Sequence, residues 1–460
     1  MPDADTSQRA GVASGAVVDA SDDLIGRSAQ RKASWRLLPI ISIGYALAYI
    51  DRVNISFASL RMNDDLHFSA TVYGLGAGLF FIGYAVCEVP SNLMLLRFGA
   101  RRWLARIMMT WGVLATAMML VQAPSEFYTL RLLLGIAEAG FFPGVVYYLT
   151  LWFPSRVRAR AVSRFYIALP LSTVVMGSLA GWLMGLNGRL GLSGWQWLFL
   201  VEGIPPILFG LVILGALPDG PKDAEWLRPE EKAWLERELA ADGARAHLGH
   251  EAGVLRALLS PKVWTIGLFF FFALTCIYAY QFSGPAILEA ATGWKIGQVG
   301  FLTAAMGVAG AAAMLFVGAS SDRSGDRGLH CIVLCSLMAA GYFVASYAHP
   351  AWLVVAALTC SWVAFCAMLG PAVAVPTEFL AGRAAAAGLA AQNSIALFSG
   401  FLGPFWMGRM KDLTGNYWLG LRWLVVPGLM AAGIMVVLMW SLARGKRTRI
   451  AGEEPAQEMA

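Results

Sequence analysis

Long runs of apolar residues recur along the whole chain and leave few choices of fold. A run of about 20 apolar residues is long enough to cross the hydrocarbon layer of a membrane as a helix. Only 14% of the residues are charged, against roughly 25% in soluble domains, and 58% are hydrophobic. The sequence therefore predicts an all-α membrane protein. We expect twelve transmembrane helices, near residues 37–60, 72–96, 103–122, 127–152, 161–186, 197–217, 263–288, 297–320, 329–347, 351–377, 385–408 and 417–442.

A polar stretch divides these spans into two groups of six. It carries charges of both signs, which is typical of a solvated helix lying on the membrane surface. Two packed six-helix bundles with a site between them are the architecture that such an internal repeat favours. The expected organisation is a polar tail at 1–35, a six-helix bundle at 36–217, a linker at 218–261, a second bundle at 262–443 and a polar tail at 444–460.

Lysine and arginine mark one side of the membrane. Clusters at Arg27–Arg36, Arg97–Arg106, Arg156–Arg164 and Arg444–Arg449 all lie on the side that an inside N-terminus makes cytoplasmic. The first 30 residues are polar and lack the apolar centre of a cleavable signal peptide. We therefore expect a multi-pass protein of a bacterial-type inner membrane with both termini in the cytoplasm. The net charge of +6 follows from this bias and does not indicate a nucleic-acid partner.

Four charged residues inside the spans of the first half are candidates for function. Each ionisable group in a span costs roughly 2.5–3.5 kcal/mol on insertion scales, so such groups are rare. A rise of about 1.5 Å per residue puts Asp51 and Arg131 at similar depth and Glu138 near the midplane. We expect Asp51 to pair with Arg131 across helices, which leaves Arg52 and Glu138 for other work. The alternative is that all four form static buried pairs that fix helix packing.

Two further buried acids favour a structural interpretation. Glu88 lies in the cytoplasmic half of the second span, where we expect it to brace the loop before Arg101. Glu202 precedes Pro205 and Pro206, where it could cap a kink.

The second half carries uncharged polar residues inside its spans, namely Tyr278, Tyr280, Gln281, Gln392 and Asn393. Each of these is more often an interhelical hydrogen-bonding residue than a ligand contact. No GxxxxGK[ST] loop occurs, which argues against ATP-driven transport. The six cysteines lie in apolar surroundings without metal-ligand context, and no nucleophile–base pair is evident. The sequence thus indicates neither an enzyme, nor a metal site, nor a cofactor.

Several motifs make the chain resemble a known family. They are Tyr49-Ile-Asp-Arg-Val-Asn54, Gly83-Tyr-Ala-Val-Cys-Glu-Val-Pro-Ser-Asn92, Gly99-Ala-Arg-Arg-Trp103 and Arg131-Leu-Leu-Leu-Gly-Ile-Ala-Glu-Ala-Gly140. Over roughly residues 30–445 the chain resembles the major facilitator superfamily, and within it the anion:cation symporter family. That family moves organic anions such as aldonates, tartrate and aromatic acids together with protons or other cations.

The resemblance also implies roles for individual residues. It assigns proton coupling to Asp51 and Glu138, and it places Arg52 and Arg131 around the substrate anion. Tyr84 matches a family tyrosine near the site. We add Tyr45, Gln281, Gln392 and Asn393 as substrate-binding candidates, because a polar substrate stripped of water needs hydrogen-bonding partners.

Two regions at matching positions in the two halves are gate candidates. They comprise Glu88 of the second span with Arg101 and Arg102 of the loop after it, and Asp322 and Arg323 after the eighth span. The superfamily loop motif has an acid where this chain has Leu96, whereas Asp322 is present at the second position. The first loop therefore departs from the family pattern, and Glu88 could take the missing role.

These observations together predict a proton-coupled symporter that imports a small organic anion by alternating access, as a monomer surrounded by membrane lipid. A hydroxylated acid such as an aldonate or tartrate is favoured. One alternative is an importer of aromatic acids. Another is a proton antiporter for efflux, which the absence of a Gly-Pro-x-x-Gly-Gly run in the fifth span disfavours.

Overall fold

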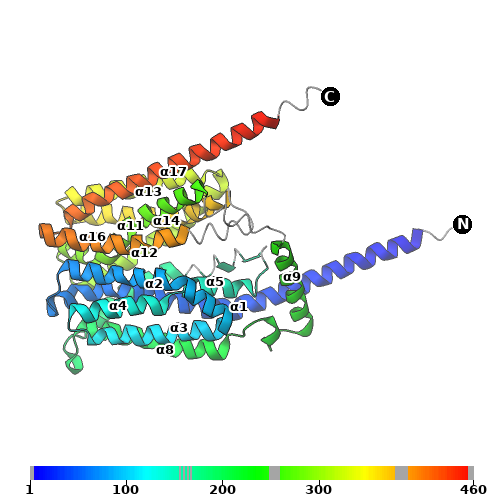
Figure 1. Ribbon diagram of the computed structural model, residues 1–460, viewed down its shortest axis with the longest axis horizontal. Coiled ribbons are helices and arrows are strands. Elements are labelled where there is room, and N and C mark those ends of the chain that lie inside the picture. The colour runs from blue at the N-terminus through cyan, green and yellow to red at the C-terminus, as the bar shows by residue number, and fades with distance from the viewer. Residues whose placement is uncertain are drawn as a thin grey trace.

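A computed structural model describes residues 5–154, 157–158, 161–162, 165, 168–247, 260–378 and 392–453. Over these residues the chain is built of helices joined by turns and loops, without a strand (Figure 1). The α-helices are α1 (Asp5–Asp65), α2 (Ala70–Phe98), α3 (Ala100–Ala117), α4 (Pro124–Glu138), α5 (Phe141–Thr150), α7 (Ala168–Met184), α8 (Gly194–Ala216), α9 (Pro229–His247), α11 (Pro261–Thr292), α12 (Ile296–Ser324), α13 (Arg327–Tyr347), α14 (Ala351–Ala374), α16 (Ser399–Thr414) and α17 (Trp418–Glu453).

Residues with strong local preferences mark many helix ends. Pro124 and Pro261 begin α4 and α11, where the missing backbone N–H of proline costs nothing. Glycines with positive φ follow the last residue of α11, α12 and α16, namely Gly293 (68°), Gly325 (68°) and Gly415 (76°). Glycine adopts this left-handed conformation without the steric cost that a Cβ brings.

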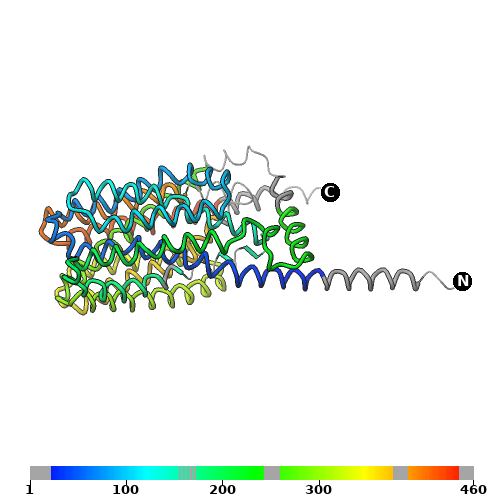
Figure 2. Tube along the Cα trace, turned by 90° about the horizontal axis from the view of Figure 1, so that it is seen from below, coloured from blue at the N-terminus to red at the C-terminus, as the bar shows by residue number. Residues whose placement is uncertain are grey.

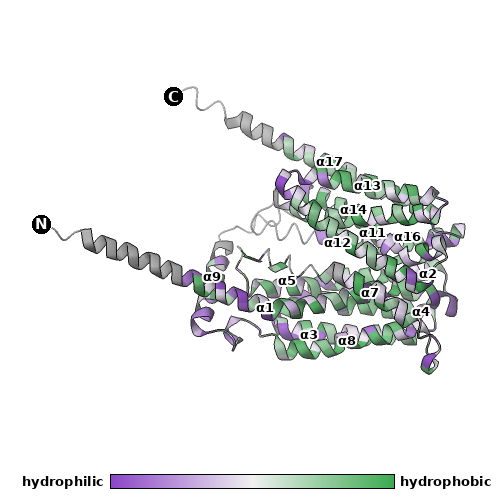
Figure 3. Ribbon diagram, turned by 180° about the vertical axis from the view of Figure 1, so that it is seen from behind, coloured by the Kyte–Doolittle hydropathy of each residue, from purple (hydrophilic) through white to green (hydrophobic). Residues whose placement is uncertain are grey.

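The apolar helices confirm a membrane protein. In the part of the chain that the structure describes, ten helices are long and apolar enough to cross a membrane. The predicted spans 161–186 and 385–408 each include residues outside the described ranges, so the count of twelve stays a prediction. Hydrophobic residues cover the lengths of the helices, and hydrophilic residues gather towards their ends and on α9 (Figure 3).

The helices form two bundles. Buried hydrophobic residues of α1 to α9 form most of one core, and those of α11 to α17 form the other. Figure 1 shows the two bundles side by side, and Figures 1 and 2 both show α9 at one end of the molecule. The bundles meet where α2 packs on α16, α7 on α12, and α1 on α11. Following the orientation predicted from lysine and arginine, we call the end that carries α9 the inner end and the opposite end the outer end.

The linker helix packs one face on the protein, so it is not solvated on all sides, and its predicted place on the membrane surface stays a prediction. Helix α1 continues through the segment predicted as a polar tail, and its residues 22–35 project at the inner end beside α9. Glu231 of α9 accepts hydrogen bonds from Ser28 Oγ (2.7 Å) and Lys32 Nζ (2.8 Å) of α1. Trp234 packs its ring against Gly26, where a Cβ would lie only 2.3 Å away. Mixed charge was taken as a sign of solvation, whereas two of the charged residues of α9, Glu231 and Arg237, form ion pairs with Lys32 and Asp22 of α1.

Candidate functional site

Asp51 and Arg52 are neighbours on α1, but their side chains have different surroundings. Asp51 is only 2% exposed, and its Oδ1 accepts a 3.3 Å hydrogen bond from Asn54 Nδ2 one turn further along the helix. Its Oδ2 is buried without a hydrogen-bond partner. Arg52, whose side chain is 17% exposed, faces a different direction because successive helical residues are about 100° apart. The Asp51 side chain therefore lies inside the first bundle, whereas the Arg52 side chain extends towards Glu138.

Arg52 forms an ion pair with Glu138 of α4. Its Nη2 donates a hydrogen bond to Glu138 Oε1, and the glutamate is 1% exposed. Glu138 is the last residue of α4, and Gly140 then adopts a left-handed conformation (φ 84°) before α5 begins. The fourth predicted span, 127–152, is therefore not one continuous helix. Interrupted spans are a recurring feature of transporter binding sites, because the break exposes backbone groups beside polar side chains.

Arg131 does not form the predicted ion pair with Asp51. Its guanidinium donates to the carbonyl oxygens of Gly76 (3.4 Å) and Ala77 (3.5 Å) on α2 and lies over the Phe80 ring at 4.8 Å. Arg131 is 1% exposed, so it lies within the first bundle rather than at its surface. Their charges still interact, as expected for residues predicted to lie at similar depth. The depth estimate could not tell which way around the helix each side chain points.

Aromatic rings surround the Arg52 guanidinium. Phe80 and Tyr84, both of α2, lie with their ring centroids 5.4 Å from it. Tyr45, two helical turns before Arg52, packs against Phe165 with a centroid separation of 4.5 Å. Cations over aromatic faces are attracted by the ring quadrupole, and the effect grows where water is excluded. The predicted residues Tyr45 and Tyr84 thus lie in the same region as Arg52 and Glu138.

The second bundle contributes residues to this region through α11. Gln281 Nε2 donates a 3.2 Å hydrogen bond to the hydroxyl of Tyr49 on α1. Tyr278 packs on Phe81 of α2 with a centroid separation of 4.7 Å and interacts electrostatically with Arg52. Gln281 was among the predicted residues, but Tyr49 and Tyr278 had no role assigned. Tyr49 lies one turn before Arg52 on the same helix, a spacing that could have identified it.

Asn393 links the bundles at a different place. Its Nδ2 donates a 3.2 Å hydrogen bond to Glu88 Oε1 of α2. The prediction that Glu88 braces the loop before Arg101 is therefore wrong, and Arg101 instead forms an ion pair with Asp219 (Nε–Oδ2, 3.3 Å). Gln392 is 9% exposed and its Oε1 has no hydrogen-bond partner. The remaining gate candidates, Arg102, Asp322 and Arg323, are exposed near the inner end.

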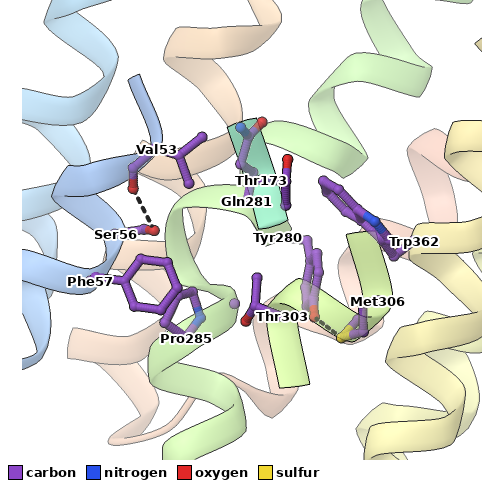
Figure 4. Close-up of a pocket in the computed structure, with 11 residues that line it drawn as sticks. Val53, Ser56, Phe57, Thr173, Tyr280, Gln281, Pro285, Thr303, Met306 and Trp362 are labelled. Carbon is purple, nitrogen blue, oxygen red and sulfur yellow. Dashed lines mark hydrogen bonds between the residues drawn. The ribbon is translucent and has the colours of Figure 1, made fainter. Parts of the chain in front are cut away.

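A small cavity lies between the bundles on the outer side of this region (Figure 4). Ser56, Thr173, Tyr280, Gln281 and Thr303 are among its lining residues, which come from α1, α7, α11, α12 and α14. It offers about 30 Å³, room for about one or two water molecules. An organic anion does not fit into this cavity.

Known proteins resemble this chain over most of its length. Residues 41–404 match the family model described as Major Facilitator Superfamily. A protein of Agrobacterium vitis named "Putative tartrate transporter" is 42% identical over 424 residues, which cover 92% of this chain and 94% of that protein. A "Quinolone resistance transporter" of Acinetobacter baumannii is 39% identical over 427 residues, covering 92% of this chain and 98% of that protein.

A solved structure also resembles the chain. It is that of a bacterial homologue of the human lysosomal transporter Spinster in an inward-facing and occupied conformation, with a TM-score of 0.71 at 18% identity. The match covers 88% of this chain and 96% of that one.

Proposed function

Because this chain belongs to the major facilitator superfamily and is a multi-pass membrane transporter, we propose that it imports a small organic anion together with protons. We further propose that the protein is a monomer in a bacterial-type inner membrane, with both termini in the cytoplasm. The observation that carries it is the ion pair between Arg52 and Glu138, which joins α1 to α4 beside the second bundle. A guanidinium at this place can bind the carboxylate of a substrate as well as that of Glu138.

Competition for Arg52 couples the anion to the proton. When a substrate carboxylate binds Arg52, Glu138 loses its cation in a site with little water. A buried carboxylate without a counter-charge is costly, so Glu138 then takes up a proton. Asp51, also buried, is the second proton carrier. After the anion leaves towards the cytoplasm, Glu138 releases its proton and pairs again with Arg52.

The substrate we favour is a small hydroxylated acid such as tartrate or an aldonate. Tyr45, Tyr49, Tyr84 and Gln281 offer hydroxyl and amide groups near Arg52, and a polyol acid needs such partners once its water is removed. The relative named for tartrate supports the same choice. The rings around Arg52 support the alternative, an aromatic acid.

A second candidate function is efflux in exchange for protons. The observation that favours it is the name of the Acinetobacter baumannii relative, which refers to quinolone resistance. Import and efflux differ in the direction of substrate movement. In a symporter the substrate moves in the same direction as the protons, whereas in an antiporter it moves in the opposite direction.

Uptake into proteoliposomes tests the proposal. Purified protein is reconstituted, a pH gradient (acidic outside) is imposed, and labelled tartrate, gluconate, 4-hydroxyphenylacetate and a fluoroquinolone are offered in turn. We expect accumulation of a hydroxy acid that a protonophore abolishes. Accumulation of the aromatic acid alone would overturn the substrate choice and leave anion symport intact. Movement of the fluoroquinolone against the proton gradient, without uptake of any acid, would replace symport with efflux.

A further inference from the structure

At the outer end, a carboxylate of one bundle caps a helix of the other. Asp412, near the end of α16, accepts hydrogen bonds from two backbone N–H groups at the start of α2. The distances are 3.0 Å from Ala70 N to Oδ1 and 2.7 Å from Thr71 N to Oδ2. The next N–H, that of Val72, donates to Ser69 Oγ at 3.2 Å. Two of the first three N–H groups of α2 are thus satisfied by the second bundle.

This contact has a physical reason to be strong. The first N–H groups of a helix have no partner within the helix, and the positive end of the helix dipole lies there. A carboxylate that accepts from two of them forms charge-assisted hydrogen bonds, which are stronger than neutral ones. Because donor and acceptor belong to different bundles, these bonds exist only while the bundles are together at the outer end.

Glycines bring the two backbones into direct contact beside the cap. A Cβ on Gly408 of α16 would lie 2.0 Å from Ala70 O, and one on Gly74 of α2 would lie 2.4 Å from Pro404 O. Figure 1 shows α2 and α16 alongside each other. Asp412 follows Gly408 by one helical turn, so the close approach carries its side chain to the end of α2. Smooth glycine surfaces allow close packing, whereas the two directed hydrogen bonds of the cap fix the position of one helix along the other.

Other contacts across the same end accompany the cap. Tyr73 donates its hydroxyl hydrogen to the backbone oxygen of Phe282 (2.7 Å), and Arg61 forms an ion pair with Glu289 (3.2 Å). The tyrosine contact is buried, whereas the ion pair is exposed and therefore weak. The cap, the tyrosine contact and the glycine contacts of α2 with α16 therefore close this end together with α7 and α12, where a Cβ on Gly181 would lie 2.6 Å from Gly297 Cα.

We propose that Asp412 is the latch of an outer gate, which closes when its carboxylate caps α2 and opens when the cap is released. The proposal rests on alternating access from the proposed function, but it concerns how the two states are balanced rather than what is carried. Removal of the latch destabilises the closed outer gate and leaves the Arg52 region unchanged. The protein then spends more time open to the outside.

Labelling of a cysteine behind the gate measures this balance. Ser56 lines the small cavity of Figure 4 and is 1% exposed, so Ser56→Cys serves as the reporter in right-side-out membrane vesicles. A membrane-impermeant maleimide is added outside, and the same chain without the added cysteine gives the background from native cysteines. We expect Asp412→Asn to raise the labelling rate of this reporter by about tenfold, since it removes a charged cap.

The chain offers a matched control in Glu126. Its Oε2 accepts from the backbone N–H groups of Gln122 (2.8 Å) and Ala123 (3.3 Å), the same chemistry, but entirely within the first bundle. Glu126→Gln should lower thermal stability without raising the labelling rate. A second test variant, Ala70→Pro, removes one donor from the other side of the latch, and proline is well tolerated at the first position of a helix. It should raise the rate by roughly threefold, because one of the two bonds remains.

The outcomes separate a latch from a structural residue. Equal labelling of Asp412→Asn, Ala70→Pro and the parent, in protein that elutes as one peak on gel filtration, would overturn the proposal. An equal rise in Glu126→Gln would also overturn it, because loosening of the fold would then explain the labelling. No substrate is added, so failure of the uptake assay does not affect this result.

Discussion

Replacement of Glu138 by glutamine gives the sharpest test of the coupling. Glutamine keeps the size of the side chain but cannot be the anionic partner of Arg52 or carry a proton. Opposite charges about 4 Å apart interact by about 4 kcal/mol at an effective dielectric constant of 20. Arg52 is 17% exposed and keeps part of its hydration, so we expect the substrate to recover only a part of this energy. A gain of about 1.4 kcal/mol corresponds to about tenfold tighter binding.

Two assays on the same proteoliposomes check this prediction. The first measures accumulation of labelled acid under an imposed pH gradient, and Glu138→Gln should abolish it. The second measures exchange of labelled for unlabelled acid without a gradient, and the variant should retain it. Binding in the variant should also depend less on pH than in the parent, whose affinity should rise on acidification towards that of the variant.

Glu202→Gln is the matched control. Glu202 is buried in the same bundle, and no arginine of the described residues forms an ion pair with it. The change is chemically the same, yet accumulation should persist because a buried carboxyl group without a counter-charge is already most stable in its neutral form. Normal gradient-driven accumulation in Glu138→Gln would refute the coupling by Glu138. Loss of exchange as well as accumulation would show a structural role for the ion pair.

The remaining predictions concern single contacts. Arg52→Lys should weaken the apparent affinity for the acid by about tenfold, because an ammonium lacks the planar fork of a guanidinium; unchanged concentration dependence of uptake would contradict direct anion contact. Gly135→Ala should lower the unfolding free energy by about 1–3 kcal/mol, because the added Cβ would lie 2.0 Å from a backbone oxygen of α2. The control is Gly215→Ala, whose Cβ meets nothing within 4 Å and which should leave thermal unfolding of the detergent-solubilised protein unchanged. Burial alone would raise the pKa of Glu231, but hydrogen bonds, above all that from Lys32, hold it below its usual value. The docking of α9 is therefore fully stabilised above the ordinary glutamate pKa of about 4.3 and weakens as the pH falls through the lowered pKa of Glu231. Proteolysis of the linker should accelerate only below about pH 4. In Glu231→Gln, the same faster proteolysis should occur at neutral pH.

Much of the fold follows from the sequence because membrane insertion and helix termination depend on local composition. A long apolar run must form a helix in lipid, since every backbone N–H and C=O needs a partner within the segment. Prolines and glycines marked helix ends such as those of α4 and α11. The rarity of charge in the spans identified Asp51, Arg52, Arg131 and Glu138 as one group, and the structure places all four in the first bundle.

Contacts between segments far apart in the sequence were not predictable in this way. The charge pattern favoured Asp51 with Arg131, whereas the ion pair joins Arg52 to Glu138. Asn393 donates a hydrogen bond to Glu88 of the first bundle, a partner that its place in the sequence does not identify.

The sequence alone determined that apolar helices span a membrane and which bundle carries the buried charges, and it predicted a depth for each charge. Tertiary structure decided which charges meet, that α9 docks on α1, and that Asp412 caps α2. Depth follows from counting residues along one helix, because each residue advances it by a fixed rise. Pairing depends also on the rotation of each helix about its axis and on the glycines that set how closely two helices approach, and these are fixed only when all the helices pack together.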